Sequence, residues 1–565
     1  MMIHVLVLVA TIQAAPAQAV ADSIVTSKRG MVVSASDLAS DAGASILRKG
    51  GNAVDAAVAT ALAMAVTYPG AGNIGGGGFM IIAPRTGEPV AIDYRERAPL
   101  ASTPGMYLKP DGTTDYSLTE SGWRAPGVPG TLRGLQMAHS RFGRLKWAAL
   151  VEPAIGLARG FRVSANFARD LNGMLAGPLA KFPSTVAAYG KPGGGKWAEG
   201  DTIHLTDLAR TLEAIAKDGP DAFYKGWIAD SIAAGMRANG GIISKQDLAE
   251  YQAKARPPIR GRFRGAEIIS MPPPSSGGTV LVEMLNVLEP YNLRSRGRNS
   301  ISSTHLIIEA MRRAFLDRAR FGADPDFVDV PVKHLTSTEY AAELRDGIDT
   351  LHASSSVVLG RDIVTDTVSA ESNETTHFSV VDSDGMAVSN TYTLEQWYGS
   401  SVVVPGTGVL LNNEMGDFNK RPGFTSVKGD IGTTPNLIQP GKRMLSSMTP
   451  TIVRRNGQVV LVTGSPGGRT IPNTVFSIVF NVLEFEMPVG AAVAAERLHH
   501  QWLPDEMYTE RKETDPEIAA LRAMGHKIRT NSHLGDGHSI GIDPATGIIT
   551  GARDTRSKDS KASAP

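Results

Sequence analysis

Thr375 occupies a position where a cut in the backbone would create a chemically active N-terminus. The preceding run, 354–374, is polar and lacks a helical or strand period, whereas 377–381 and 386–393 alternate as two strands around a turn at 382–385. A Thr at a free N-terminus carries its own base, because its α-amino group has an ordinary pKa of about 7.7–8.0 and lies close to the side-chain hydroxyl. The pattern is compatible with an N-terminal nucleophile. On this stretch alone, however, an ordinary Thr that starts a strand is favoured, because Thr is common in strands.

A second stretch with catalytic potential is the turn 463–468, Thr-Gly-Ser-Pro-Gly-Gly. A predicted strand, 458–462, leads into it, and a predicted helix, 470–483, follows with Pro472 in its first turn. Such a turn directs backbone N–H groups and the positive end of a helix dipole at one point, which suits an oxyanion. Glycine turns also serve close packing, so these residues alone leave both interpretations open.

Composition excludes several kinds of site. The chain has 565 residues, 42% of them hydrophobic, and its 57 basic and 56 acidic side chains leave a net charge of +1. This balance argues against a general nucleic-acid or anionic-membrane surface. The absence of cysteine excludes disulfides, thiolate metal sites and cysteine nucleophiles. Because no long linker of biased composition interrupts the chain, we expect one large domain.

The N-terminus predicts export. A short apolar core, 3–10, is followed by small residues at Ala17 and Ala19, which fits a signal peptide at 1–19, although Lys and Arg are missing from the first residues. The run is too short to span a membrane, so we expect no stable membrane insertion. A periplasmic or secreted location follows; the alternative is a frayed N-terminal strand.

Helical and strand periods are mixed along the chain, and its C-terminal part is richer in strands. Glu309 and Arg313 share one helix face, which we expect to combine packing with solvated charge. The polar tail after Arg556, 556–565, is expected to be disordered. The main predicted helices are 37–49, 53–67, 221–239 and 302–320, and two hairpins are predicted over 451–462 and 539–552.

Two short motifs do not predict a cofactor or metal site. Residues 70–75 satisfy G-x-G-x-x-G, but they follow a helix and precede a strand, which is the reverse of the dinucleotide-binding order. His499 and His500 are not part of a His-Glu-x-x-His helix, so a structural role is expected for them.

Several longer motifs, in a fixed order, carry a more specific signal. They are residues 75–80, 93–96, 271–278, 375–377, 408–418, 445–450 and 463–468. From about Gly30 to about Arg556 the chain resembles the γ-glutamyltranspeptidase family of N-terminal nucleophile hydrolases. The resemblance implies an α+β fold, the four-layer αββα sandwich, built as one large domain from two fragments. These would be 20–374 and 375–565, produced by self-cleavage between Glu374 and Thr375.

The resemblance also implies how a bond would be broken. Thr375 would be the nucleophile and Thr393 its hydrogen-bond partner, while the N–H groups of Gly467 and Gly468 would bind the oxyanion. The substrate would be glutathione or another γ-glutamyl amide. Water or an amino acid or dipeptide would accept the γ-glutamyl group, and no metal or organic cofactor would be required.

A free α-amino acid end carries both charges, so its site needs cations and acids close together. The resemblance assigns the α-carboxylate to Arg95, Ser446 and Ser447, and the α-amino group to Glu414 and Asp417. Without it, the two acids would be interpreted as solvated surface charges.

Three residues depart from the pattern of related enzymes. Glu395 stands where well-known relatives have a substrate-contacting Asn, Gly416 where many have Asp, and Lys428 where some place an aromatic residue on a lid. The identities of the leaving group and of the acyl group of the substrate therefore stay open. One alternative is a glutaryl-cephalosporin acylase, or another γ-linked amide hydrolase, with the same mechanism. The other is an exported, non-catalytic binding protein on the same scaffold.

Overall fold

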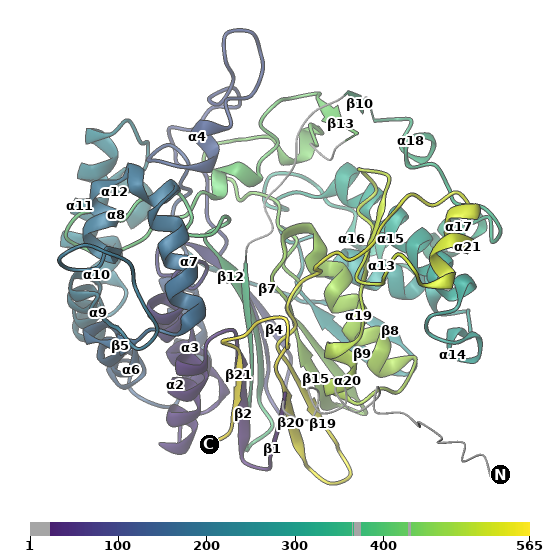
Figure 1. Cartoon of the computed structure of the whole chain (residues 1–565), viewed down its shortest axis with the longest axis horizontal. Coiled ribbons are helices and arrows are strands. Elements are labelled where there is room, and N and C mark those ends of the chain that lie inside the picture. Colours follow the sequence, from purple (N-terminus) through teal and green to yellow (C-terminus); the bar gives the residue numbers. More distant parts are fainter. Residues whose placement is uncertain (1–22, 364, 367–374, 428–430) are drawn as a thin grey trace, which may run out of the picture.

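The computed structural model describes residues 23–363, 365–366, 375–427 and 431–565. Two antiparallel sheets lie between two layers of helices (Figure 1), which confirms the predicted αββα arrangement and the α+β class. The predicted signal peptide, Glu374 and Lys428 all fall outside the described residues. Among the residues described, no helix combines the length and the apolar character needed to cross a membrane.

The first sheet contains the strand that begins beside Thr375. The predicted hairpin is present at its centre as β11 and β12, and β2 and β3 pair with its two outer edges. In order across the sheet, the strands are β21 (Lys561–Ser563), β2 (Gly30–Ser34), β11 (Thr376–Asp382), β12 (Ala387–Thr393), β3 (Gly77–Ala83), β4 (Val90–Asp93) and β7 (Lys254–Arg256).

The second sheet contains both other predicted hairpins. Asn456 and Gly457 connect β14 to β15 with φ angles of 52° and 79°, the left-handed conformation that Asn-Gly turns favour. In order across the sheet, the strands are β1 (Ile24–Ser27), β20 (Ile549–Ala552), β19 (Ser539–Ile542), β15 (Gln458–Thr463), β14 (Thr451–Arg455), β9 (Ala266–Ser270) and β8 (Ile259–Phe263).

The side chains of the first sheet alternate between two cores, because neighbouring residues of a strand point to opposite faces. Val32 and Ile82 pack under the helices of one outer layer. Val33 and Ile81 point the other way, into the core that contains Val462 of the second sheet. The two sheets therefore face each other across a shared apolar layer.

The helical layer over the first sheet is built around α3, whose fifteen residues are all buried, as expected for a core helix. Asn52 caps it and Asp55 completes the capping box. This layer includes α2 (Asp37–Arg48), α3 (Ala53–Thr67), α5 (Thr131–Phe142), α6 (Trp147–Arg159), α7 (Ala165–Leu175), α9 (Thr206–Asp218), α10 (Asp221–Tyr224) and α11 (Trp227–Ala238).

The opposite helical layer carries residues that reach the site described below. Its principal members are α13 (Gly277–Leu288), α15 (Ile301–Phe321), α17 (Thr338–Asp346), α19 (Ile471–Leu483), α20 (Val489–Ala494) and α21 (Pro516–Ala523).

The tail 556–565 was predicted to be disordered, and this prediction is wrong. Its strand β21 pairs with the edge of β2, and Ala562 is only 3% exposed. Lys561 and Ser563 both bind the carboxylate of Asp41 on α2, at 2.9 and 2.7 Å. A polar composition did not reveal that alternate residues of this tail complete a sheet.

The predicted helix 221–239 is divided into α10 and α11. Gly226, between them, is extended, and a Cβ there would lie 2.9 Å from the Ala222 carbonyl oxygen. The predicted helix 302–320 is present as α15, but Glu309 and Arg313 are buried rather than solvated.

Candidate active site

A cavity of about 40 Å³ lies where β11 and β12 meet the turns of the second sheet. Nine of the predicted site residues line it, whereas Gly467 does not and Glu374 is not described. Its lining residues are Arg95, Arg318, Thr375, Thr393, Glu395, Glu414, Asp417, Ser446, Ser447, Met448, Gly468, Arg469 and Ile471.

The first sheet places the two threonines opposite each other. Thr376 of β11 pairs with Tyr392 of β12, and one further step in this antiparallel register brings Thr375 opposite Thr393. Thr375 is 5% exposed, and the Thr393 hydroxyl accepts a hydrogen bond of 2.9 Å from the Glu395 N–H. A hydroxyl nucleophile at Thr375 would therefore be shielded from bulk water.

The glycine turn has two positive φ angles, and at Gly467 the conformation suits only glycine. Gly467 and Gly468 have φ angles of +126° and +54°, and a Cβ on Gly467 would lie 2.3 Å from the Thr470 hydroxyl oxygen. The turn leads through a short 3₁₀ helix, η4 (Gly468–Thr470), into α19, with Pro472 at its start. Gly468 thus enters the cavity wall at the N-terminal end of a helix, where an anion is favoured.

Arg95 is the fully buried centre of an ion cluster that joins the residues predicted for the two ends of an amino acid. One guanidinium nitrogen lies 2.7 Å from a Glu414 oxygen, and the other contacts the Asp417 carboxylate. The same guanidinium donates to the carbonyl oxygens of Met444 at 3.5 Å and Leu445 at 3.2 Å. The cation and both acids are therefore already in one place before any ligand arrives.

A fourth charged group, Glu96, was not predicted. One of its oxygens lies 3.8 Å from Arg95, and its side chain is fully buried. Burial raises the pKa of Glu96 to about 8, against the lowering effect of Arg95. Burial also raises the pKa of Glu414, and the carboxylates of Glu96, Asp417 and Glu395 add to that rise.

The serine pair is held by the turn 272–278. The Ser276 N–H and hydroxyl both donate to the Ser446 carbonyl oxygen, at 2.9 and 2.8 Å, and the Ser446 N–H donates to the Pro274 carbonyl at 3.0 Å. The Ser446 hydroxyl oxygen accepts from the Met448 N–H at 3.1 Å. The turn 272–278, which precedes Thr375 in the chain, thus holds the serine pair, which follows Thr375.

Arg318 and Arg469 line the cavity without having been predicted. Arg318 lies near the end of α15, and its guanidinium donates to the hydroxyl oxygens of Ser276 at 3.0 Å and Ser447 at 2.9 Å. A helical period can place Arg318 on a face of α15, but only tertiary packing brings that face to Ser447. Arg469 follows the two glycines directly, so its position next to that motif was an available signal.

A larger cavity of about 300 Å³ adjoins the first, and Arg318, Glu395, Asp417 and Arg469 line both. Gly416 also lines this outer cavity, together with Tyr116, Lys420 and Phe424 from the surrounding loops. The inner cavity suits a small acyl group, and the outer one leaves room for what is attached to it.

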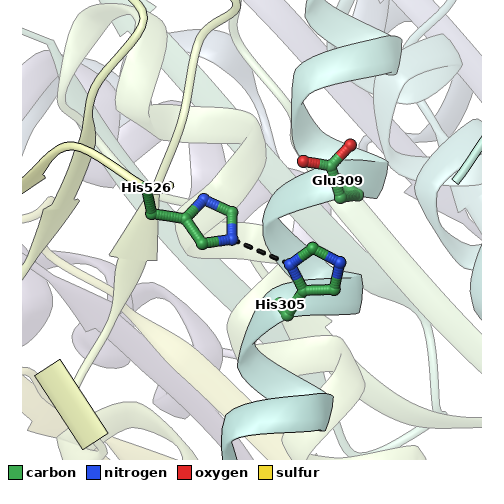
Figure 2. A group of neighbouring side chains, drawn as sticks. All are labelled: His305, Glu309 and His526. Atoms are coloured by element: carbon green, nitrogen blue, oxygen red, sulfur yellow. Dashed lines mark hydrogen bonds between the residues drawn. The ribbon is translucent and has the colours of Figure 1, made fainter. Parts of the chain in front are cut away.

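One group of histidines and an acid, outside this cavity, has the spacing of a metal site. Figure 2 shows His305 and Glu309 one turn apart on α15, with His526 directed toward them. The His305 Nδ1 and His526 Nε2 atoms are 2.8 Å apart, and the other His305 nitrogen lies 2.7 Å from the Asp349 carbonyl oxygen. A carbonyl at that position is a common partner of a metal-binding imidazole.

The charges around this group do not fit a metal. Glu309 binds Arg312 at 3.3 Å and Arg313 at 2.5 Å, and Arg312 also contacts Asp505. Two arginines and two acids already balance, so a divalent cation would add uncompensated buried charge. His526 therefore belongs to a buried polar network that we interpret as structural.

Comparisons with known proteins agree on one family. The family model for gamma-glutamyltranspeptidase matches residues 39–564. The glutathione hydrolase proenzyme of Escherichia coli (strain K12) is 44% identical over 538 residues, covering 95% of this chain and 92% of the relative. The acylase ACY 1 proenzyme of Pseudomonas sp. (strain SE83) is 39% identical over 535 residues, covering 93% and 91%.

Solved structures show the same relationship. The cephalosporin acylase from Bacillus halodurans superimposes with a TM-score of 0.82 at 28% identity, covering 96% of this chain and 97% of that one. The gamma-glutamyltranspeptidase from Pseudomonas nitroreducens, complexed with L-DON, is 42% identical with a TM-score of 0.53, covering 56% of this chain and 94% of that one. Together with the nearly full-length sequence matches, these show that the chain belongs to the gamma-glutamyltranspeptidase family.

Proposed function

We propose that this chain is a precursor that cuts itself before Thr375 and then transfers γ-glutamyl groups to water, an amino acid or a dipeptide. The observation that carries the proposal is the composition of the inner cavity. A shielded Thr375 lines it together with Gly468, whose N–H group could bind an oxyanion, and with Arg95 and its acidic partners. The Escherichia coli relative is a glutathione hydrolase proenzyme by name, which agrees with this activity and with a processed precursor.

The first reaction would be maturation. The Thr375 hydroxyl oxygen attacks the carbonyl carbon of Glu374, the C–N bond between the two residues breaks, and the nitrogen takes up the hydroxyl proton. Water then hydrolyses the ester and leaves Thr375 with a free α-amino group. The fragments would be 20–374, after loss of a signal peptide, and 375–565.

The second reaction would use that new N-terminus. The α-amino group accepts the proton of the Thr375 hydroxyl as its oxygen attacks the γ-glutamyl carbonyl, and the negative oxygen is stabilised by the N–H groups of Gly467 and Gly468. Collapse breaks the amide C–N bond, returns the proton to the departing amine and leaves a γ-glutamyl ester on Thr375. Water or an incoming amine then releases the γ-glutamyl group. This scheme uses no metal and no organic cofactor.

The ion cluster suits the free amino acid end of such a substrate. The substrate carboxylate would pair with Arg95 and accept from Ser446 and Ser447, while its ammonium group would pair with Glu414 and Asp417. Because Arg95 already pairs with those acids, binding exchanges one set of ion pairs for another, and no charge is left buried alone. This exchange favours a zwitterion over a ligand with only one charge.

The acylase relatives define the competing function. A glutaryl group keeps the carboxylate and lacks the ammonium, so it would leave Glu414 and Asp417 without their partner. Glu395 brings a third carboxylate to the same wall, which further favours γ-glutamyl over glutaryl. We expect kcat/KM to be at least about 10-fold higher for a γ-glutamyl anilide than for the glutaryl anilide. The opposite order would identify an acylase.

Mass spectrometry of the purified protein tests the processing step. We expect a fragment that begins at Thr375, and a Thr375→Ala variant that remains one polypeptide without anilide release. Wild-type protein that stays uncut yet is active would overturn the mechanism. Uncut and inactive protein would favour the non-catalytic binding protein.

Export is part of the proposal, because the apolar segment 3–10 followed by Ala17 and Ala19 supports a signal peptide. Expression in a bacterial host should yield periplasmic protein that begins at about residue 20. Protein that stays in the cytoplasm and retains residues 1–19 would contradict the proposed export, but not the proposed reaction.

A further inference from the structure

Arg318 connects the opposite helical layer to the serine pair of the cavity. Its Nε donates to the Ser276 hydroxyl oxygen at 3.0 Å and its Nη2 to the Ser447 hydroxyl oxygen at 2.9 Å. It lines the inner cavity with Thr375 and also lines the outer one. The guanidinium thus fixes two hydroxyls at the point where the cavities join.

The direction of these hydrogen bonds determines where the hydroxyl protons go. A guanidinium can only donate, so both serine oxygens must accept from Arg318 and turn their own protons elsewhere. The Ser276 proton goes to the Ser446 carbonyl at 2.8 Å. The Ser447 proton is directed away from Arg318, in a wall that also contains Arg95.

The hydroxyl oxygen of the neighbouring Ser446 also accepts a hydrogen bond from a group that can only donate. The Ser446 hydroxyl oxygen accepts from the Met448 N–H at 3.1 Å, which leaves its proton to be donated as well. Two adjacent hydroxyls that each already accept one hydrogen bond can both direct their protons at a carboxylate, which accepts such charge-assisted bonds well.

We propose that Arg318 is a positioning residue that makes Ser447 a hydrogen-bond donor to the α-carboxylate of the acyl substrate. This inference rests on the proposed γ-glutamyl transfer and specifies how the carboxylate end is recognised. Arg318 acts through Ser447, while Arg95 supplies the positive charge that pairs with the carboxylate.

The proposal is tested with three anilides. The γ-glutamyl anilide has both charges, the glutaryl anilide has only the carboxylate, and the 4-aminobutyryl anilide has only the ammonium. For Arg318→Gln we expect kcat/KM to fall about 10- to 100-fold on the first two substrates and by less than about 3-fold on the third. Arg318→Lys, which can hold one serine but not both in the same geometry, should lie between.

A double-mutant cycle identifies the route of the effect. In a Ser447→Ala background, Arg318→Gln should lower kcat/KM by less than about 3-fold further, because the hydroxyl that it positions is gone. A full additional loss would mean that Arg318 contacts the carboxylate itself, and it would overturn the positioning role.

Arg320→Gln is the matched control, because Arg320 is on the same helix and its contacts go to Asp317 and Asp362 instead of the cavity. Maturation is measured for every variant by the appearance of the fragment that begins at Thr375. Equal losses on all three anilides, or failure of both Arg318 variants to mature while Arg320→Gln matures, would show a structural role and overturn the proposal. Wild-type protein that releases no anilide would instead refute the proposed function.

Discussion

Glu395 occupies a backbone conformation that glutamate rarely adopts. Its φ is +80°, in the left-handed region, where Asn is tolerated better because its short side chain can bond locally. Its carboxylate contacts the Asn413 amide and is one of the neighbours that raise the pKa of the buried Glu414. Glu395 therefore lies beside the other acids of the cavity, so we expect its charge to attract the ammonium group of a substrate.

We predict that Glu395→Gln lowers kcat/KM for a γ-glutamyl anilide by about 3- to 10-fold, because one carboxylate that attracts the substrate ammonium is lost. The value for the glutaryl anilide should stay the same or rise, since this substrate has no ammonium. The measurement is the ratio of the two kcat/KM values, determined at equal protein processing. Parallel losses on both substrates would contradict the assignment to the ammonium side.

Glu395→Asn is the matched variant. It also removes the charge, but it suits the left-handed backbone, so its thermal midpoint should exceed that of Glu395→Gln. The backbone difference is on the order of 1 kcal/mol. Equal midpoints would show that the +80° conformation carries no strain at this position.

Residue types alone could predict part of this site and not the rest. Thr375, Gly467 and Gly468 belong to local patterns, a strand start and a strand–turn–helix unit, so the order of residues made them candidates and the family resemblance supplied their roles. Glu96 and Arg318 become informative only through burial and through contacts with segments far away in the chain. Sequence spacing shows which residues share a helix face, but not what covers that face.

At the scale of elements, α15 also shows that sequence spacing predicts a helix but not what covers its faces. Its length was predicted well, yet its charged face is buried, and Arg313 donates to the carbonyl oxygens of Leu344 at 3.0 Å and Gly347 at 2.6 Å. The His305 Nε2 faces a carbonyl oxygen and must donate to it, so in the neutral ring Nδ1 accepts from His526 Nε2. The remaining His526 nitrogen, Nδ1, is buried without a hydrogen-bond partner among the described residues. A second proton on His526 would therefore be poorly accommodated.

This arrangement predicts that stability decreases in mild acid. Burial, helped by His305 and Arg312, lowers the pKa of His526 to about 4 from an ordinary 6.5. Below pH 6.5 the unfolded chain binds the proton and the folded one does not, so stability is present above 6.5 and is lost as pH falls toward 4. The loss attributable to His526 should be on the order of 1–3 kcal/mol.

His526→Gln checks this assignment, because the glutamine amide can still donate to His305 but cannot titrate. We expect its thermal midpoint to vary less than that of the wild type between pH 7 and pH 5. His352→Gln is the control, since the His352 side chain is 73% exposed. If His526→Gln and the wild type lose stability equally over this range, His526 is not the titrating group.

The C-terminal strand gives a second prediction for an element. β21 covers the edge of β2, and its Ala562 is buried. Removing 558–565 should lower the free energy of unfolding by about 2 kcal/mol or more, because ladder hydrogen bonds and the Asp41 contacts are lost and apolar surface is uncovered. Ala562→Asp should act in the same direction, whereas removal of 564–565 alone should have little effect. A truncated protein that unfolds at the same denaturant concentration as the wild type would contradict this role.

At the scale of the whole molecule, the proposed cleavage separates the chain but not the fold. Both seven-stranded sheets combine strands from before and after Thr375, so each fragment contributes to each of them (Figure 1). Within these two sheets, the pairings that would join the fragments are β2 with β11, β3 with β12, β2 with β21, β1 with β20, and β9 with β14. Neither fragment contains all the strands of either seven-stranded sheet, and separation would expose unpaired strand edges and both apolar cores.

We therefore predict that the mature fragments behave as one folding unit. They should elute together in size-exclusion chromatography even at nanomolar concentration and should unfold in one cooperative transition. After full denaturation, Thr375→Ala precursor should refold in higher yield than mature protein, because its intact backbone keeps the two halves at a high effective concentration. Fragments that separate on dilution in native buffer, or mature protein that refolds as well as the uncut variant at low concentration, would show that the interleaved sheets are not what holds the halves together.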